Sequence, residues 1–344
     1  MPVTLKELAA QIGMSVSTVS KALNDYPDIK SETKQLIRSA ASQAGYQPNS
    51  MARSLKTGRT FNIGVLYSDD IHFGFMHSYF SPILQSFKTE TEARGYDLTF
   101  ISHRVGRNPM TYLDTCLYRN VDGVCVVCAQ FDDPEVIRLM SGPIPSVSID
   151  FMFNSRTCVQ SQNLEGMTML VRHVLSKGHT RVAMVEGAQD DNLVTHIRRV
   201  CFMKAMEEAG VPVREAYIVS GSFHDPDAAR RATEALLALP EPPTCILMSD
   251  DYAALGGLDA IRSAGLRVPE DISVAGFDGV EWIQRIHPRL TTVWQDTQTI
   301  GREAARKLID LVEAPRTTLP EIVRIPCRLI EGETVADLSA ASHR

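Results

Sequence analysis

From residue 61 onward, short runs rich in Val, Ile and Leu alternate with longer amphipathic segments. This alternation constrains the fold more than any other feature of the chain. Short apolar runs with β-branched side chains are typical of buried strands, and the segments between them have helical periodicity. Strands that alternate with helices form parallel sheets covered by helices on both faces, with right-handed crossovers. The sequence therefore predicts two successive α/β units.

The first unit is expected to hold four strands and three helices, and the chain leaves it around Asn154–Ser161. The strands are expected at Asn62–Tyr67, Asp97–Ile101, Gly123–Ala129 and Ser146–Ile149, and the helices at Phe80–Arg94, Tyr112–Asn120 and Pro134–Met140. In the second unit, helices are expected at Met167–Ser176, Arg198–Ala209, Ala228–Ala238 and Ala253–Ala264, and strands at Arg181–Val185, Tyr217–Val219, Cys245–Met248 and Ser273–Ala275.

The first 47 residues have the pattern of a small helical domain. Thr4 and Glu7 form the signature of a capping box, which opens a helix that ends at Gly13. Ser15 is expected to cap a second helix, and Ser31 a third that runs to Gly45. Two short helices joined by a glycine turn form a helix-turn-helix, whose second helix can enter a DNA major groove.

Helical periodicity assigns the faces of these helices. In the second helix, Val19, Ala22 and Leu23 are expected to pack inward, which leaves Val16, Ser17, Ser20 and Lys21 facing outward. The third helix is expected to complete the core with Leu36, Ile37, Ala40, Ala41 and Ala44. The second helix thus presents small and basic side chains to solvent.

Charge is distributed unevenly along the chain. Of 35 basic and 41 acidic residues, the first 60 positions hold eight basic and four acidic ones. A basic head on an acidic body indicates a polyanion partner that only the head contacts. Together with the helix-turn-helix pattern, this asymmetry favours DNA.

Residues 48–60 separate the head from the α/β units. Met51, Ala52 and Leu55 form one apolar stripe on a possible two-turn helix, and such short helices are marginal in water without a partner. An ordinary linker and a hinge helix ordered by DNA are both compatible with this stretch taken alone.

Seven cysteines, an odd number, are scattered through the expected core elements. Cys125 and Cys128 fall on one expected strand with side chains on opposite faces, so they are expected to pack rather than to bind metal or form a redox pair. The sequence begins with no apolar targeting segment, and its apolar runs have strand length. We expect a cytoplasmic protein with no metal, no cofactor and no membrane association.

Polar residues follow the expected strands, at the sheet edge where ligands of open α/β folds bind. They are Ser68, Asp69, Asp150, Gly187, Phe223, Ser249, Asp250 and Asp278, with Arg198 at the start of the adjoining helix. Several carboxylates facing one arginine suit a polyhydroxylated neutral ligand, and an aromatic ring can stack on a sugar or a base. The acidic loop at 69–72 leaves an amino-bearing ligand open, and Asp250 or Asp278 could instead cap a helix.

Residues 3–24, VTLKELAAQIGMSVSTVSKALN, resemble the headpiece of the LacI/GalR family of bacterial transcriptional regulators. The resemblance continues through Gly45–Asn49 and Ala52–Leu55 and extends over essentially the whole chain. It implies a helix-turn-helix headpiece at 1–47, a hinge helix at 48–60, and a two-lobed periplasmic-binding-protein-like core of type I at 61–344. The first lobe would comprise about 61–160 plus 294–323, and the second about 161–293 plus 324–340.

The resemblance also implies roles for individual residues. Val16, Ser17 and Lys21 would meet base edges in the major groove, and Leu55, beside Ala52 and Lys56, would wedge into the minor groove. Thr4, Ser15, Ser20 and Asn24 are suited to phosphates. The implied effector contacts are Ser68, Asp69, Asp150, Arg198, Phe223, Asp250 and Asp278.

The implied protein is a repressor that acts as a homodimer on a near-palindromic operator and responds to a small polar effector, a sugar or sugar derivative. An enzyme is the competing class, but the sequence has no Walker loop, no GxGxxG and no HExxH motif. A solute-binding protein for transport would have no use for residues 1–60.

Overall fold

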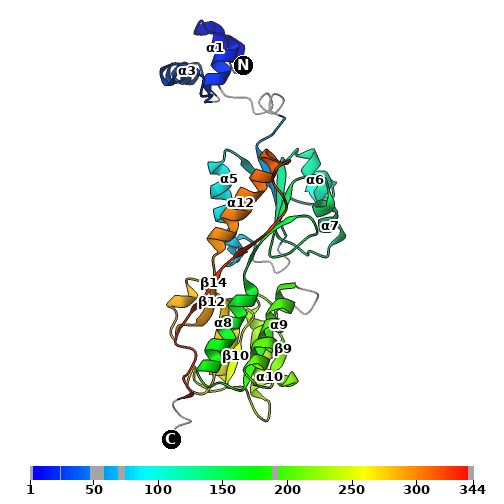
Figure 1. Cartoon of the computed structure of the whole chain (residues 1–344), viewed down its shortest axis with the longest axis vertical. Helices are drawn as coiled ribbons and strands as arrows, with labels where there is room; N and C mark the ends of the chain where they lie inside the picture. The colour runs from blue at the N-terminus through cyan, green and yellow to red at the C-terminus, as the bar shows by residue number, and fades with distance from the viewer. Residues whose placement is uncertain (1–2, 24, 47–57, 69–73, 188–192, 340–344) are drawn as a thin grey trace. The chain divides into compact units, whose positions relative to one another are not determined.

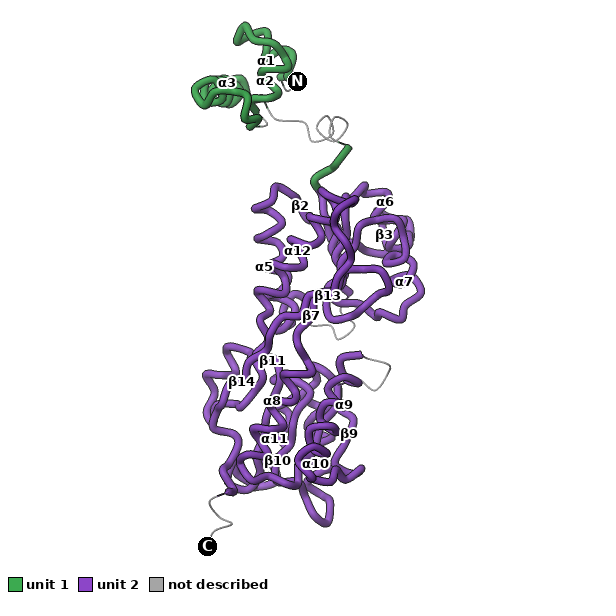
Figure 2. Tube along the Cα trace, in the orientation of Figure 1, with its two compact units in different colours: residues 1–61 green, residues 62–344 purple. Residues whose placement is uncertain are grey.

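The computed structural model describes residues 3–23, 25–46, 58–68, 74–187 and 193–339. The chain divides into two compact units, Met1–Phe61 and Asn62–Arg344 (Figure 2). Each unit has its own hydrophobic core, and each is described by itself. Among the described residues, no helix has both the length and the apolar character needed to cross a membrane.

The described part of the first unit has the helices α1 (Leu5–Gln11), α2 (Val16–Leu23) and α3 (Ser31–Gln43). The predicted capping box is present at α1, since the Thr4 hydroxyl accepts from the Glu7 N–H and the Glu7 carboxylate accepts from the Thr4 N–H. Ser15 caps α2 by accepting from the N–H of Thr18 at 3.0 Å. The helices enclose a core of Leu8, Ala9, Val19, Ala22, Ile37 and Ala41.

Three predictions about α3 are wrong. Its N-cap residue is Lys30, so Ser31 is the first helical residue, and the helix ends at Gln43 rather than Gly45. Leu36 is 57% exposed instead of packing in the core, because its neighbour Ile37 occupies the inward position. Apolar residues at adjacent positions cannot both point into so small a core.

The second unit contains two six-stranded sheets (Figure 1). The first is wholly parallel in the order β13-β7-β6-β5-β1-β2. Its strands are β1 (Asn62–Tyr67), β2 (Asp97–Ile101), β5 (Gly123–Cys128), β6 (Ser146–Ile149), β7 (Thr157–Ser161) and β13 (Ile322–Ile325). The helices of this lobe are α5 (Phe80–Ala93), α6 (Tyr112–Tyr118), α7 (Pro134–Ser141) and α12 (Thr297–Glu313). A short ribbon of β3 (Arg104–Val105) and β4 (Asn108–Pro109) is attached to it.

The second sheet has the order β14-β12-β11-β10-β8-β9, with only β14 antiparallel. Its strands are β8 (Val182–Glu186), β9 (Ile218–Ser220), β10 (Cys245–Leu247), β11 (Ser273–Asp278), β12 (Thr291–Gln295) and β14 (Cys327–Ile330). Its helices are α8 (Asn163–Ser176), α9 (Leu193–Glu208), α10 (Pro226–Leu237) and α11 (Asp251–Ser263). Apolar clusters lie on both faces of this sheet.

The chain passes between the two lobes three times, after β7, after β12 and after β13 (Figure 1). The lobe boundaries differ slightly from those expected. Strand β7 (Thr157–Ser161) belongs to the first sheet, so the chain leaves this lobe after Ser161, next to the expected limit at about residue 160. The second passage comes after Gln295, whereas it is expected before Trp294. Strand β13 places Ile325 in the first lobe, whereas residues from 324 onward are expected in the second.

The strands β7 and β12 were missed because Thr, Cys and Gln interrupt their apolar residues. Both are nevertheless buried along most of their length, since interior hydroxyls find hydrogen-bond partners. The Thr292 hydroxyl, for example, donates to the Asp251 carboxylate at 2.6 Å. All seven cysteines are free thiols, with Cys125 inside the first sheet and its sulfur unpaired with that of Cys128.

Candidate functional site

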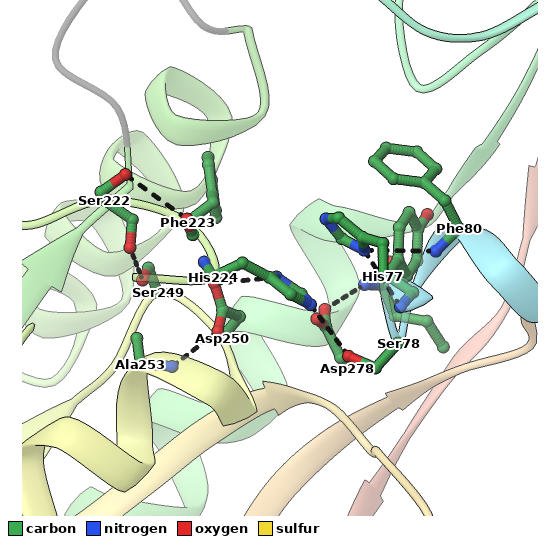
Figure 3. A network of polar contacts seen from close by, with 12 residues as sticks. His77, Ser78, Phe80, Ser222, Phe223, His224, Ser249, Asp250, Ala253 and Asp278 are labelled. Carbon is green, nitrogen blue, oxygen red and sulfur yellow. Dashed lines mark hydrogen bonds and ion pairs between the residues drawn. The ribbon is translucent and has the colours of Figure 1, made fainter. Parts of the chain in front are cut away.

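The carboxyl ends of β6, β10 and β11, with the loop after β9, carry most of the predicted ligand residues. Ser249, Asp250 and Asp278 lie near one another at the second sheet, and His224 follows Phe223 in the adjacent loop (Figure 3). Asp150 follows β6 in the first lobe. Three of these residues, Asp150 (φ 60°), His224 (φ 54°) and Asp278 (φ 118°), have positive φ angles that non-glycine residues rarely adopt. Such strained backbone is concentrated at functional sites in proteins.

Arg198 is the cation of this site and is only 5% exposed. It lies on the sixth residue of α9, not at the start of the helix as expected, because the helix begins at Leu193. Its Nε donates to Asn163 Oδ1 at 3.0 Å and its Nη1 to the Ser249 carbonyl at 2.8 Å. The guanidinium also lies 3.6 Å from the centroid of the Phe277 ring. These contacts fix the plane of the guanidinium. A fixed plane is required if two guanidinium N–H donors are to bind one ligand group together.

Asp278 is the last residue of β11 and accepts a hydrogen bond from Gln295 Nε2 at 2.7 Å. Burial, with the nearby Asp250 carboxylate, raises the pKa of Asp278 well above its ordinary value, although Arg198 opposes the shift. A carboxyl group of raised pKa can donate a hydrogen bond as well as accept one. Gln295 could not be proposed from the sequence, because no strand was predicted at Thr291–Gln295.

Asp150 accepts a hydrogen bond from the Tyr79 hydroxyl at 2.6 Å through Oδ2. Its Oδ1 is buried and has no hydrogen-bond partner among the described residues. Burial raises the pKa of Asp150, and the Tyr79 hydrogen bond and Arg198 oppose that shift. An unpaired buried carboxylate oxygen is costly, so Oδ1 is an acceptor for which a ligand hydroxyl or amine would be the natural partner.

Asp250 has a framework role. Its Oδ1 accepts from the N–H of Ala253, which caps α11, and its Oδ2 accepts from the N–H of His224. Both distances are 2.7 Å. With both oxygens engaged by backbone, Asp250 orders the loop and helix, as in the capping alternative that the sequence left open.

The other predicted positions differ in what they contribute. A Cβ on Gly187 would lie 2.2 Å from the Phe223 ring, so only glycine lets that ring take its place. The Ser249 hydroxyl donates to the Ser222 carbonyl at 3.2 Å. Ser68 forms a backbone hydrogen bond to Cys128. Asp69 lies outside the described residues.

The candidate DNA-reading surface is the exposed face of α2. Val16 is 43% exposed, Ser17 is exposed, and Ser20 and Lys21 are partly exposed, as predicted from the helical periodicity. Lys21 Nζ, however, forms an ion pair with Asp28 Oδ2. The pair is solvent-exposed on both sides and therefore weak, so Lys21 can exchange Asp28 for a base or phosphate at little cost.

Other residues proposed for DNA contact are engaged locally or lie outside the description. The Thr4 hydroxyl belongs to the capping box, and the Ser15 hydroxyl caps α2. Asn24, Ala52, Leu55 and Lys56 lie outside the described residues.

A buried carboxylate behind the site predicts a pH dependence of stability. Asp251 is fully buried, and burial, reinforced by Asp250, raises its pKa from 3.8 to about 7 against the hydrogen bonds from Thr292 and Val280. Between these values the folded state binds more protons than the unfolded state, so the unfolding free energy falls as pH rises. We expect Asp251 to contribute a loss of about 3 kcal/mol between pH 5 and pH 8.

Urea unfolding of the wild type and of Asp251→Asn at these two pH values measures this contribution. The variant should lose less stability than the wild type over the interval, because the titrating group is gone. Equal losses in the two proteins would contradict the assignment.

Comparison with known proteins is consistent along the whole chain. A family model described as "Bacterial regulatory proteins, lacI family" matches residues 4–49, and one described as "Periplasmic binding protein-like domain" matches residues 171–335. The HTH-type transcriptional repressor PurR of Pectobacterium carotovorum subsp. carotovorum (strain PC1) is 32% identical over 340 residues, which is 97% of each chain. PurR of Shigella sonnei (strain Ss046) is 32% identical over 341 residues, also 97% of each chain.

Solved structures agree on the fold. The transcriptional regulator CelR in complex with cellobiose has a TM-score of 0.71 and 25% identity, over 96% of this chain and 99% of that one. The lac repressor dimer bound to operator and the anti-inducer ONPF has a TM-score of 0.79 at 24% identity, over 98% and 100% of the two chains. The helical head and the two-lobed α/β core are therefore shared with these proteins.

Proposed function

Because this chain belongs to the LacI family of bacterial regulatory proteins, we propose that it represses transcription and that a small polar effector controls its affinity for an operator. The observation that carries the proposal is the coexistence of two features on separate compact units. One is a helix-turn-helix with an exposed polar face, and the other is a set of buried polar groups at the strand ends of an α/β core. The relatives are named as repressors and not as enzymes.

On the DNA side, Val16, Ser17 and Lys21 read base edges, and Thr4, Ser15, Ser20 and Asn24 contact phosphates. Two headpieces of a homodimer then bind the half-sites of a near-palindromic operator. Exposure of the α2 face supports this assignment. The Thr4 hydroxyl already donates to Glu7 Oε2 at 2.9 Å, so it must exchange that acceptor for a phosphate oxygen. The Ser15 hydroxyl can donate to a phosphate while it accepts from the Thr18 N–H, because a hydroxyl has one donor and two acceptor sites. Such a repressor works in the cytoplasm, on the nucleoid.

On the effector side, the ligand is a sugar or sugar derivative that lies between the lobes. Asp150 Oδ1 and Asp278 are acceptors for hydroxyl groups, and the remaining Arg198 nitrogen is a donor. Phe223, held against Gly187, can stack on an apolar ring face. The site has three carboxyl groups and only one guanidinium, which disfavours a strongly anionic ligand. The carboxyl groups are those of Asp150, Asp250 and Asp278, and the guanidinium is that of Arg198. The match to a cellobiose-bound regulator is consistent with a sugar.

Two measurements test the proposed function. Selection from a pool of random duplexes should return a near-palindromic site, which the full-length protein binds with an affinity that falls steeply with salt. A thermal-shift screen against sugars, sugar phosphates, nucleosides, purine bases and amino sugars should identify a ligand that raises the midpoint and alters operator affinity. Failure to enrich any duplex would contradict the proposal.

The hinge is tested by Leu55→Ala. If Leu55 wedges between base steps, the variant should bind the operator roughly 10- to 100-fold more weakly, because it loses the contact that offsets unstacking. Effector affinity should stay unchanged, since the effector groups lie in the other unit. Gel-shift titration and isothermal calorimetry measure the two quantities. Wild-type operator affinity in Leu55→Ala would refute the wedge.

A further inference from the structure

A stack of two histidines joins the lobes of the core. His77 precedes α5 in the first lobe, and His224 precedes α10 in the second. Their rings lie 3.7 Å apart between centroids at an interplanar angle of 26° (Figure 3). The Ser78 hydroxyl adds a hydrogen bond of 2.8 Å to His224 Nε2. His77 is 4% exposed and His224 2%, so the contact is dry.

Each histidine is fixed within its own lobe. Nδ1 of His77 accepts from the N–H groups of Tyr79 and Phe80 at the start of α5. The N–H of His224 donates to Asp250, and its ring stacks on Tyr252 of α11 at 5.0 Å, which in turn meets Trp282 at 5.6 Å. Because neither ring can follow the other lobe, any separation of the lobes breaks both the stack and the Ser78 hydrogen bond.

We propose that His77, Ser78 and His224 form a latch that favours the closed arrangement of the lobes. A contact made in only one of two arrangements shifts the equilibrium toward that arrangement by its own free energy. Arg198, Asp278 and Ser249 are buried close to the latch, so a ligand reaches them only when the lobes part. The latch therefore sets how much of the protein is open before effector arrives.

The latch acts by holding the lobes and the loop at His224 in position, and not by contacting the ligand. His224 has a positive φ of 54°, and its ring contacts His77 of the first lobe. Asp250, whose two oxygens are used for the backbone of this loop and of α11, supports the same geometry. Only the consequence for operator affinity rests on the proposed function, because it requires that lobe geometry controls the headpiece.

Variants can separate the parts of the latch. His77→Asn keeps a side-chain acceptor for the α5 amides but removes the ring. His224→Asn removes the other ring and tolerates positive φ. Ser78→Ala removes only the hydrogen bond. The control is His103→Asn, because the tilted ring pair of His103 and Tyr112, 3.8 Å apart between centroids, lies within one lobe.

Small-angle X-ray scattering of full-length protein without added ligand measures opening. His77→Asn should raise the open-to-closed ratio about tenfold and Ser78→Ala about threefold, with a larger radius of gyration. His224→Asn removes both the stack and the Ser78 hydrogen bond, so it should raise the ratio about thirtyfold, while His103→Asn should match the wild type. The double variant His77→Asn/His224→Asn should open no further than His224→Asn, because the two rings form one contact. Unchanged scattering in all three latch variants, or additive effects in the double variant, would overturn the proposal.

Circular dichroism shows which variants are folded, and Ser78→Ala carries the test if loss of a buried histidine unfolds the core. Operator titrations separate the latch from the proposed function. If the variants open but the wild type binds no operator, the latch stands and the proposed function fails. If the wild type binds operator but no variant opens, the proposed function stands and the latch fails.

Discussion

Arg198→Ala should abolish the response to effector while operator affinity stays within about threefold of the wild type. The guanidinium is buried and fixed by Asn163 and the Ser249 carbonyl, so its free donor is preorganised for a ligand. Removing a charged hydrogen-bonding group of this kind costs about 3 kcal/mol, which weakens effector binding roughly 100-fold. Calorimetry with the effector and anisotropy with labelled operator measure the two affinities.

The chain offers a matched control for this prediction. Arg199 is the next residue of α9, but its side chain is 50% exposed and forms an ion pair with Glu186. Arg199→Ala should therefore leave effector binding unchanged, because the ion-pair partner of Arg199 is the buried Glu186, which is not one of the proposed effector contacts. Arg198→Lys distinguishes charge from geometry, since lysine keeps the charge and loses the fork. Wild-type effector affinity in Arg198→Ala would remove this residue from the proposed site.

The fold was predictable from the sequence to the extent that its elements are apolar and periodic. Strands such as β1 and β5, with continuous runs of Val and Ile, were located to within a residue or so. Strand β12 was missed because its interior threonines look polar in sequence. Their hydroxyls are satisfied by partners distant in sequence, as in the hydrogen bond from Thr292 to Asp251. Such long-range pairing has no local signature.

The candidate site shows the same limit. Asp150, Asp278 and Ser249 could be proposed because strand ends gather at one sheet edge. The residues that hydrogen-bond to these carboxylates could not be proposed from the sequence. Tyr79 directly precedes α5, and Gln295 is the last residue of β12. Each hydrogen-bonds to a carboxylate of the site that lies far from it in the sequence. Asp250 illustrates the opposite case. Its carboxylate is of a type suited to ligand binding, but both of its oxygens accept hydrogen bonds from backbone N–H groups.

The stack of His77 on His224 joins residues 147 positions apart in the sequence. The hydrogen bond between Ser78 and His224 likewise spans 146 positions. No periodicity or spacing rule relates these positions. The sequence could supply the residues at strand ends, but contacts between lobes depend on the closed geometry of the whole core. Functional coupling of this kind is therefore visible only once the lobes are assembled.

Val19→Asp should eliminate operator binding by unfolding the headpiece while the core remains intact. Val19 is fully buried in α2 among Leu8, Ala22 and Ile37. An unpaired carboxylate there costs several kcal/mol, and a domain of this size has little stability to lose. Operator affinity should fall by about 1000-fold or more. The midpoint of the core and its effector affinity should not change, because the core has separate hydrophobic clusters.

Val16→Asp on the same helix separates loss of fold from loss of contact. Val16 is 43% exposed, so a carboxylate there stays solvated and the headpiece should remain folded. Operator binding should still weaken, because the new charge faces the phosphates and base edges that α2 approaches. Limited proteolysis distinguishes the two variants, since only the headpiece of Val19→Asp should become rapidly cleaved. If Val19→Asp also lowered the midpoint of the core, the two units would not be independent, and the effector signal would have to pass through a shared core instead of the segment between them.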